Sequence, residues 1–268
     1  MPKNKDTSWG GVAKWYDSLL KMDGTYQREV ILPNLLRLLD IKKGEKVLDI
    51  ACGQGFFSRA VAEKGGEVTG VDIASELIKF AQEKAGKSEK TAPEAGSVRY
   101  LVAPADKLGK DVLNNSFDKA VIVLAIQNIE NLNGVLAEAS RALKVGGKLF
   151  LVLNHPAFRN PKYTSWGFSE KDKVQYRRVD EYLSESQTEI DMTPGTEKEN
   201  KKKSTVSFHR PLQVYFNTLI NNGFLVGRLE EWNSNKKSEA GPRQKAEDKA
   251  RQEIPLFMLI EVVKNNLQ

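Results

Sequence analysis

The chain contains two apolar segments of similar length, residues 46–51 and 67–72, with a glycine-spaced loop and one amphipathic stretch between them. The first segment carries Asp49 and leads into the loop of residues 53–55, and the second segment ends at Asp72. This order predicts a strand, a tight turn, a helix and a second strand, which is the βαβ unit of a parallel sheet. Such units bind nucleoside-bearing ligands across the carboxyl ends of their strands. No other segment constrains the fold as strongly.

Strands and helices are predicted to alternate along most of the remaining chain. Further strands are expected over residues 97–102, 118–125, 148–153, 224–230 and 255–263. The segment 118–125 is almost continuously apolar, which is typical of a strand covered on both faces. The last two segments are predicted to form a hairpin at the sheet edge. The sequence therefore predicts an α/β fold, a Rossmann-like and mostly parallel sheet with helices on both faces.

The chain of 268 residues is predicted to form a single domain of four parts. Residues 1–40 should form an N-terminal helical cap, and residues 41–154 the cofactor-binding core. The alternating pattern breaks after Asn154, so residues 155–210 are interpreted as an insertion that acts as a lid or substrate wall. Residues 211–268 should supply a C-terminal helix and the edge hairpin, with a polar loop predicted over 233–252.

Composition excludes several classes of protein. The chain has one cysteine, Cys52, which rules out an intrachain disulfide. With only that cysteine and two histidines far apart in sequence, the chain lacks the Cys and His ligands of a structural zinc site. Cys52 itself is interpreted as a small residue that fills a tight turn. The first residues lack the apolar core of a secretory signal, and no apolar run reaches the length of about 20 residues that spans a bilayer. We therefore expect a cytoplasmic protein with no membrane partner and no metal.

The residues between the first two strands favour a particular class of ligand. Side chains at Gly53 or Gly55 would hold the backbone away from a bound nucleoside, although a tight strand-to-helix turn alone could also require glycine. Asp72 can accept hydrogen bonds from both ribose hydroxyls, or it can cap the following helix. A dinucleotide loop usually carries a third glycine, and Ser58 occupies that position here. Asp49 would repel a pyrophosphate but would suit a ligand with an ammonium and a sulfonium.

These motifs resemble the first two motifs of the class I S-adenosylmethionine-dependent methyltransferases, in particular the branch that acts on small molecules. The resemblance covers residues 47–55 and 70–72 and continues at 105–106, 117–129 and 143–153. It is looser over 208–232 and 254–264. It implies a sheet of seven strands of which the last is antiparallel.

The resemblance also implies roles for individual residues. Gly53, Gly55 and the region of Asp49 and Ala51 should hold the methionine end of S-adenosylmethionine. Asp72 should bind the ribose, Ile73 should pack on the adenine ring, and Asp106, beside Ala105, should accept from the adenine amino group. Leu124 should present its carbonyl near the methionine amino group, and Tyr16 should close over the cofactor. The residues with these predicted roles are Tyr16, Asp49, Ala51, Gly53, Gly55, Asp72, Ile73, Ala105, Asp106 and Leu124.

The implied reaction is in-line methyl transfer to an oxygen, nitrogen or carbon atom of a small molecule, with S-adenosylhomocysteine as the product. His209 and His155 are the candidate general bases. The alternative for His209 is a structural histidine that bonds a backbone carbonyl or helix end, and the alternative for His155 is a residue that only caps or lines the pocket. Transfer by proximity alone remains a complete alternative mechanism. The segment after the fourth strand, residues 127–129, lacks the Asn-Pro-Pro-Tyr type of motif of several enzymes that methylate adenine or glutamine.

Three other functions stay open at this point. The net charge of +6 is concentrated in residues 201–203 and 236–249, so an RNA methyltransferase that uses these basic loops is possible, although solvated loops are the simpler interpretation. A non-catalytic regulator that only binds the cofactor is a second alternative. An NAD-dependent reductase is a third, and Asp49 and Ser58 both oppose it.

Overall fold

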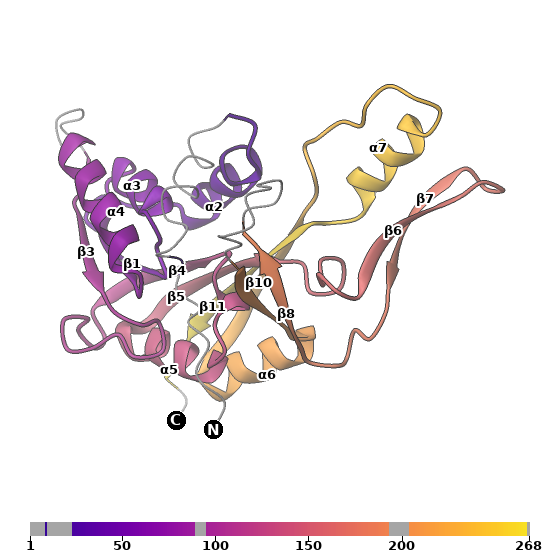
Figure 1. Cartoon of the computed structure of the whole chain (residues 1–268). Helices are drawn as coiled ribbons and strands as arrows, with labels where there is room; N and C mark the ends of the chain where they lie inside the picture. Colours follow the sequence, from indigo (N-terminus) through magenta and orange to yellow (C-terminus); the bar gives the residue numbers. More distant parts are fainter. Residues whose placement is uncertain (1–8, 10–22, 89–94, 193–203, 267–268) are drawn as a thin grey trace.

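A computed structural model describes residues 9, 23–88, 95–192 and 204–266. Its centre is a seven-stranded sheet in the order β10-β11-β5-β4-β1-β2-β3 (Figure 1). The strands are β1 (Lys46–Ile50), β2 (Glu67–Asp72), β3 (Val98–Val102), β4 (Phe117–Val123), β5 (Leu143–Asn154), β10 (Phe224–Trp232) and β11 (Phe257–Lys264). Only β11 runs antiparallel to its neighbours on both sides. The predicted Rossmann-like sheet with an antiparallel last strand is therefore confirmed.

The parallel pairing brings the ends of the predicted βαβ unit together. β1 lies between β2 and β4, with Asp49 opposite both Gly70 and Val121. The carboxyl ends of these three strands consequently meet at one edge of the sheet, followed by residues 51–55, 73–74 and 124–131. This edge is where an open α/β sheet receives a ligand.

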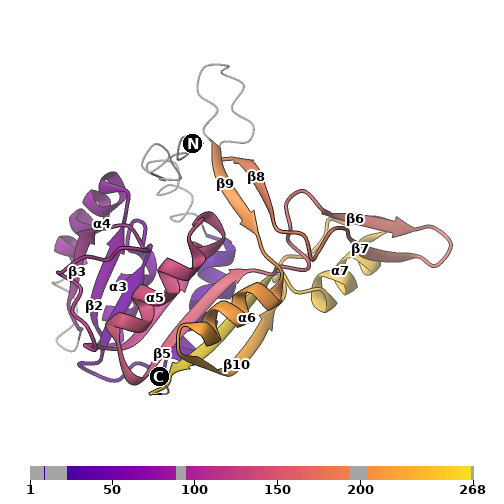
Figure 2. The ribbon, with the colours of Figure 1, turned by 90° about the horizontal axis from the view of Figure 1, so that it is seen from below.

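Helices cover both faces of the sheet, as the alternating sequence predicts (Figures 1 and 2). One face carries a π-helical turn η2 (Gln27–Ile31), α2 (Leu32–Leu39), α3 (Phe56–Glu63) and α4 (Ser75–Ser88); the other carries α5 (Leu132–Ala142) and α6 (Leu212–Asn221), with the short 3-10 turn η3 (Ile126–Asn128) between β4 and α5. Leu35, Leu39 and Val61 pack on the first face, and Val135, Leu136 and Leu219 on the second. Both faces of the central strands are buried, which explains their continuous apolar sequences.

Two structural features differ from the sequence-based expectations. The prediction of a polar loop over residues 233–252 is wrong, because the second half of this segment forms helix α7 (Gln244–Glu253). Charged residues dominate this helix and hide its apolar face from a periodicity search, and Ala250 is its buried residue. Strand β5 also begins five residues earlier than predicted, and Gly146 inside it has a φ of 77°.

The insertion after β5 folds into two hairpins that are separate from the main sheet. They pair β6 (Thr164–Ser169) with β7 (Val174–Val179), and β8 (Ser186–Asp191) with β9 (Ser204–His209). The first hairpin projects away from the sheet together with α7 (Figures 1 and 2). Arg243 joins the two elements, with its guanidinium 4.4 Å from the ring centre of Phe168 and 2.5 Å from Glu170. The second hairpin reaches the ligand edge, where Asn128 Nδ2 donates to the carbonyl of Val206.

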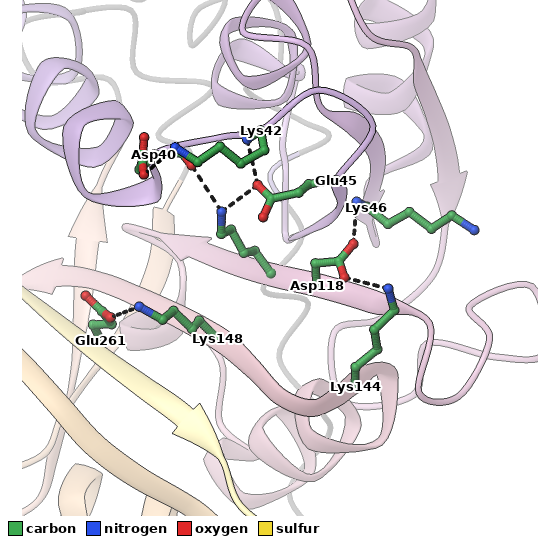
Figure 3. Close-up of polar contacts among 9 residues, drawn as sticks. Asp40, Lys42, Glu45, Lys46, Asp118, Lys144, Lys148 and Glu261 are labelled. Carbon is green, nitrogen blue, oxygen red and sulfur yellow. Dashed lines mark hydrogen bonds and ion pairs between the residues drawn. The ribbon is translucent and has the colours of Figure 1, made fainter.

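A network of opposite charges occupies the amino ends of β1 and β4 (Figure 3). Asp118 accepts from the backbone N–H of Lys46 and from Lys144 Nζ, and Glu45 accepts from Lys119 Nζ at 2.5 Å. Isolated pairs of this kind contribute little, so the network is best understood as fixing where the strands start. No helix in the described ranges is long and apolar enough to cross a bilayer.

Tyr100 of β3 explains two of the glycines in the βαβ unit. A Cβ atom on Gly55 would lie 2.3 Å from the Tyr100 hydroxyl, and one on Gly70 would lie 2.7 Å from its ring. Gly55 also has φ of 75°, in the left-handed region that favours glycine. These glycines therefore allow the Tyr100 side chain to lie beneath the ligand loop, packed against Cys52 and Ile78.

We expect Gly70→Ala to destabilise the protein by about 1–3 kcal/mol, because its methyl group would overlap the Tyr100 ring. Without that overlap, alanine in a strand would stabilise by up to about 1 kcal/mol. Gly227→Ala in β10 is the matched control, since its Cβ would meet only ordinary contacts at 3.7 Å or more. Urea unfolding of Gly70→Ala, Tyr100→Ala and the double variant measures the coupling. If Gly70→Ala lowers the free energy of unfolding equally in the wild type and in the Tyr100→Ala variant, this explanation is contradicted.

Candidate functional site

A cavity of about 440 Å³ opens at the carboxyl ends of β1, β2 and β4. Its volume lies within the usual range of about 300–1,000 Å³ for small-molecule sites. Most of the residues with a predicted cofactor role line it, namely Ala51, Gly53, Asp72, Ile73, Ala105, Asp106 and Leu124. They come from four separate loops, so the sheet topology brings them together.

Three of the residues with a predicted cofactor role are not among the lining residues. Asp49 lies in β1 beneath the loop, and its side chain is buried against Ser58. Gly55 begins α3 and contacts Tyr100, so packing accounts for it. Tyr16 lies outside the described residues. The roles of these residues toward a ligand stay predictions.

The backbone of the cavity wall has an unusual conformation at two positions. Ala51 has φ of 59° and Leu124 has φ of 53°, although both carry a Cβ atom. Left-handed conformations of such residues cost on the order of 1 kcal/mol or more and concentrate at functional sites. Leu124 is held there by its N–H bond to the Val152 carbonyl, and its own carbonyl accepts from Gln127 Nε2 at 2.8 Å. Both left-handed residues line the cavity, and they follow the adjacent strands β1 and β4.

Asp72 ties the first two strand ends together. One carboxylate oxygen accepts from the N–H of Gly53 and the other from the N–H of Ala74, each at 2.8 Å. Burial raises the pKa of Asp72 above its ordinary value, and the two N–H donors oppose that rise. Both interpretations of this residue are therefore compatible, because the carboxylate caps the turn before α4 and still lines the cavity with further lone pairs.

Asp49 contrasts with Asp72 because it is sealed below the loop. It accepts a hydrogen bond of 2.5 Å from Ser58 Oγ. Burial raises its pKa to about 7, the Ser58 bond opposes the rise, and the negative charge of Asp72 adds to it. The serine at the third position of the loop thus has a structural role as the partner of this acid.

Apolar side chains also line the cavity. Ile73 lines the cavity with 54% of its surface exposed, which is unusual for a large aliphatic side chain. Trp9 and Leu77 line it as well, and Trp9 packs on the cluster of Ala74 and Leu77. An aromatic ring of a ligand could lie against this surface, since apolar groups supply most of the contact in such sites.

His155 is held by structural contacts at the end of β5. Its Nε2 lies 2.7 Å from Glu231, and its Nδ1 accepts from the N–H of Ala157. Because Nδ1 accepts, Nε2 must carry the proton that is donated to Glu231. Burial lowers the pKa of His155, and Glu231 only partly offsets this. The ring does not line the cavity.

His209, at the end of β9, lies at a different cavity of about 520 Å³ between α5, α6 and β8. Its Nε2 donates to the carbonyl of Tyr182 at 2.8 Å. The neighbouring Arg210 is buried and donates to the carbonyls of Ile129 and Glu130. Glu130 and Asn131 separate this cavity from the first one and line both. Neither histidine is therefore next to the predicted cofactor residues.

The basic segments either do not line this cavity or lie outside the described residues. Lys201–Lys203 belong to the latter. Lys236 lies 3.8 Å from Glu29, and Arg243 is paired with Glu170. Within the described ranges, no three His, Cys, Asp or Glu side chains are grouped so that they could hold a metal ion.

Several wall residues were not identified from the sequence. Trp9, Leu77, Glu130 and Asn131 line the cavity without belonging to a motif quoted above. The polar pair directly precedes α5, and Asn131 accepts from the N–H of Gly134 as a helix cap. An Asn before an apolar helical pattern signals that cap in the sequence, but not its position on the cavity.

Comparison with known proteins gives consistent results. Residues 48–151 match the family model of a methyltransferase domain. The demethylmenaquinone methyltransferase of Tropheryma whipplei (strain Twist) is 31% identical over 121 residues, 45% of this chain and 46% of the relative. The ubiquinone biosynthesis O-methyltransferase of Idiomarina loihiensis is 34% identical over 107 residues, 40% of this chain and 41% of the relative. The chain thus spans about half the length of these curated relatives.

Solved structures are similar over most of the chain. An S-adenosylmethionine-dependent methyltransferase from Mesorhizobium loti has a TM-score of 0.66 at 25% identity, covering 90% of this chain and 99% of that one. One from Listeria monocytogenes has a TM-score of 0.62 at 21% identity, covering 88% and 97%. The similarity therefore extends beyond the domain match to the elements around it.

We expect Asp49→Asn to change how stability depends on pH. The folded-state pKa of about 7 exceeds the ordinary value of 3.8, so the unfolded chain loses this proton first as pH rises. Asp49 therefore destabilises the wild type progressively between about pH 4 and pH 7, by roughly 1.4 kcal/mol per pH unit, and the effect is constant above pH 7. Relative to the wild type, Asp49→Asn should gain about 2–3 kcal/mol between pH 5 and pH 8.

Urea unfolding at several pH values measures this difference. Asp118→Asn is the control with the opposite sign, since Lys144 and the N–H of Lys46 hold the pKa of Asp118 below its ordinary value despite its partial burial. Asp118→Asn should lose stability relative to the wild type as pH rises through the acid range, because the ionised Asp118 stabilises the folded wild type. If the difference between Asp49→Asn and the wild type stays constant with pH, the buried carboxyl is not protonated as described.

Proposed function

We propose, from the premise that this chain contains a class I S-adenosylmethionine-dependent methyltransferase domain, that the protein transfers a methyl group from S-adenosylmethionine to a small-molecule acceptor. The observation that carries this proposal is the cavity at the carboxyl edge of β1, β2 and β4. It combines Gly53, Asp72 and Asp106 with an apolar wall, as a nucleoside with a charged tail requires.

The lining residues fit the parts of this cofactor in turn. Asp72 would accept from the ribose hydroxyls, and two backbone N–H groups anchor its carboxylate at the cavity. Ile73 and Ala105 can enclose the adenine ring, with Asp106 as the acceptor for its amino group. The left-handed turns at Ala51 and Leu124 present backbone groups for the methionine end. Asp49 adds negative charge below the loop, which favours a cationic ligand once it is ionised.

Bound S-adenosylmethionine supplies a methyl group on a positively charged sulfur, and S-adenosylhomocysteine is the product. The chain contributes by fixing both reactants in line and by excluding water. Well-oriented reactants can gain about 7–11 kcal/mol from positioning alone. The Leu124 carbonyl, at the methionine end, would stabilise positive charge near the methyl group.

The positions of the two histidines favour transfer by proximity over transfer with a histidine base. His155 and His209 both direct Nε2 toward other protein groups and lie outside the cofactor cavity. A general base must come within about 3 Å of the proton it removes, directly or through one water. We infer that both rings hold the insertion and the C-terminal elements in place.

Transfer of label from methyl-labelled S-adenosylmethionine tests the proposed activity directly. Demethylmenaquinone is the first acceptor to test, because it is named in the Tropheryma whipplei relative. A pool of small molecules from cell extract extends the test to other acceptors. Labelling of total RNA instead would assign the acceptor to nucleic acid, and cofactor binding without any labelled product would indicate a non-catalytic protein.

We expect Asp72→Ala to weaken binding of S-adenosylhomocysteine by about 10-fold or more, since lost hydrogen bonds to a charged group cost about 1.5–3 kcal/mol. Asp118→Asn is the matched control, because Asp118 is an acid at the opposite, amino edge of the sheet. Isothermal titration calorimetry measures both affinities. Unchanged affinity in a folded Asp72→Ala variant would contradict the ribose assignment.

His209→Ala separates the two mechanisms. If positioning supplies the rate, turnover should fall by less than about 10-fold and its dependence on pH should be unchanged, because removing a general base typically costs about 100-fold or more. Steady-state kinetics from pH 6 to pH 9 make this measurement. A 100-fold loss of kcat with normal cofactor affinity would restore His209 as the base.

A further inference from the structure

Asn131 joins a cavity residue to the start of a helix. Its Nδ2 donates to Asp106 Oδ2 at 2.9 Å, and its Oδ1 accepts from the N–H of Gly134 at 2.9 Å. Asp106 belongs to the loop after β3, whereas Asn131 caps α5, so the contact connects two loops on the same side of the cavity.

The direction of this amide is fixed by its partners. A backbone N–H can only donate, so the amide oxygen must face Gly134. A carboxylate can only accept, so the amide nitrogen must face Asp106. The side chain therefore has one orientation that satisfies both groups, and in it the amide nitrogen donates to Asp106 Oδ2.

Gly134 provides the space that this arrangement needs. A Cβ atom at Gly134 would lie 2.3 Å from Asn131 Nδ2, the atom that contacts Asp106. Glycine costs up to about 1 kcal/mol relative to alanine within a helix. The space that glycine leaves for the Asn131 side chain explains why Gly134 is tolerated here.

The other oxygen of Asp106 is thereby left for a ligand. Asp106 lines the cavity, and within the described ranges its Oδ1 makes no hydrogen bond. We propose that Asn131, seated against Gly134, is a positioning residue that holds this oxygen toward the amino group of the purine and so makes the site selective for a 6-aminopurine. This inference rests on the proposed function, because it assumes that the cavity receives the adenine ring.

The selectivity follows from restricting the carboxylate. A 6-oxopurine presents a carbonyl where adenine presents its amino group, and it carries an N–H on the adjacent ring nitrogen. A carboxylate held in place meets that carbonyl and repels it. A carboxylate free to rotate can move to the neighbouring N–H and accept from it. Loss of the Asn131 contact should therefore affect the two purines in opposite directions.

Calorimetry with S-adenosylhomocysteine and its deaminated analogue S-inosylhomocysteine tests the proposal. The wild type should prefer the adenosyl compound by roughly 10- to 100-fold, the range of one hydrogen bond to a charged group. Asn131→Ser keeps a helix-capping oxygen but is too short to reach Asp106, so this ratio should fall below about 3-fold. Gly134→Ala should lower the ratio as well, because it displaces the amide nitrogen without removing it.

Asn133→Ser is the matched control, since Asn133 lies in the same helix turn but contacts Asn222 instead. It should keep the wild-type ratio. A general loss of stability would weaken both ligands equally and leave the ratio unchanged, so the ratio reports positioning alone. Thermal unfolding confirms that each variant is folded, and Gly134→Ala tests the same contact if Asn131→Ser does not fold.

Two results would overturn the inference. In the first, the wild type binds both compounds equally. In the second, folded Asn131→Ser and Gly134→Ala both keep the wild-type ratio of the two affinities. If the wild type binds neither compound, the proposed function itself fails. These outcomes are distinguishable because the first two include normal binding of S-adenosylhomocysteine.

Discussion

The Asp72 carboxylate is the interaction on which the ligand edge depends. It accepts from the N–H groups of Gly53 and Ala74 and thereby joins the loops that follow β1 and β2. Because each loop leads into a helix, the same two bonds set where α3 and α4 begin over the sheet. The group proposed to bind the ribose is thus already rigid before any ligand arrives, and such preorganisation lowers the cost of binding.

Beneath that carboxylate, the site is supported by a buried layer with little freedom. Ser58 bonds Asp49, and Tyr100 fills the space left by Gly55 and Gly70. Close packing of this layer keeps the backbone at Ala51 in its left-handed conformation, which would otherwise relax. The acids of the region therefore divide into two kinds. Asp72 and Asp106 line the cavity, whereas Asp49 is enclosed and burial raises its pKa to about 7.

The elements beyond the core differ in how they relate to this edge. The β8–β9 hairpin contacts it through Asn128 and Val206, so part of the insertion forms a wall next to the cavity. The β6–β7 hairpin and α7 project elsewhere and are joined by Arg243 (Figures 1 and 2). Residues 155–210, which the sequence analysis describes as one lid or substrate wall, thus contain two hairpins with different surroundings. The Asn131–Asp106 contact adds a second connection between loops, here those that follow β3 and β4.

The sequence by itself determined the parallel core and the position of its ligand edge. Apolar runs predict strands covered on both faces, and the strand–turn–helix–strand order assigns Gly53 and Asp72 to one edge of the sheet. The family resemblance then implied that Asp106 and Leu124 face the same ligand. Tertiary structure alone decided which of the nearby polar residues reach that cavity. Asp49, His155 and His209 have suitable chemistry, yet packing turns each toward another protein group. Helix α7 and the contact of Asn131 with Gly134 could not be predicted from the sequence either. They depend on contacts between residues far apart in sequence or on side-chain direction, and hydrophobic periodicity encodes neither.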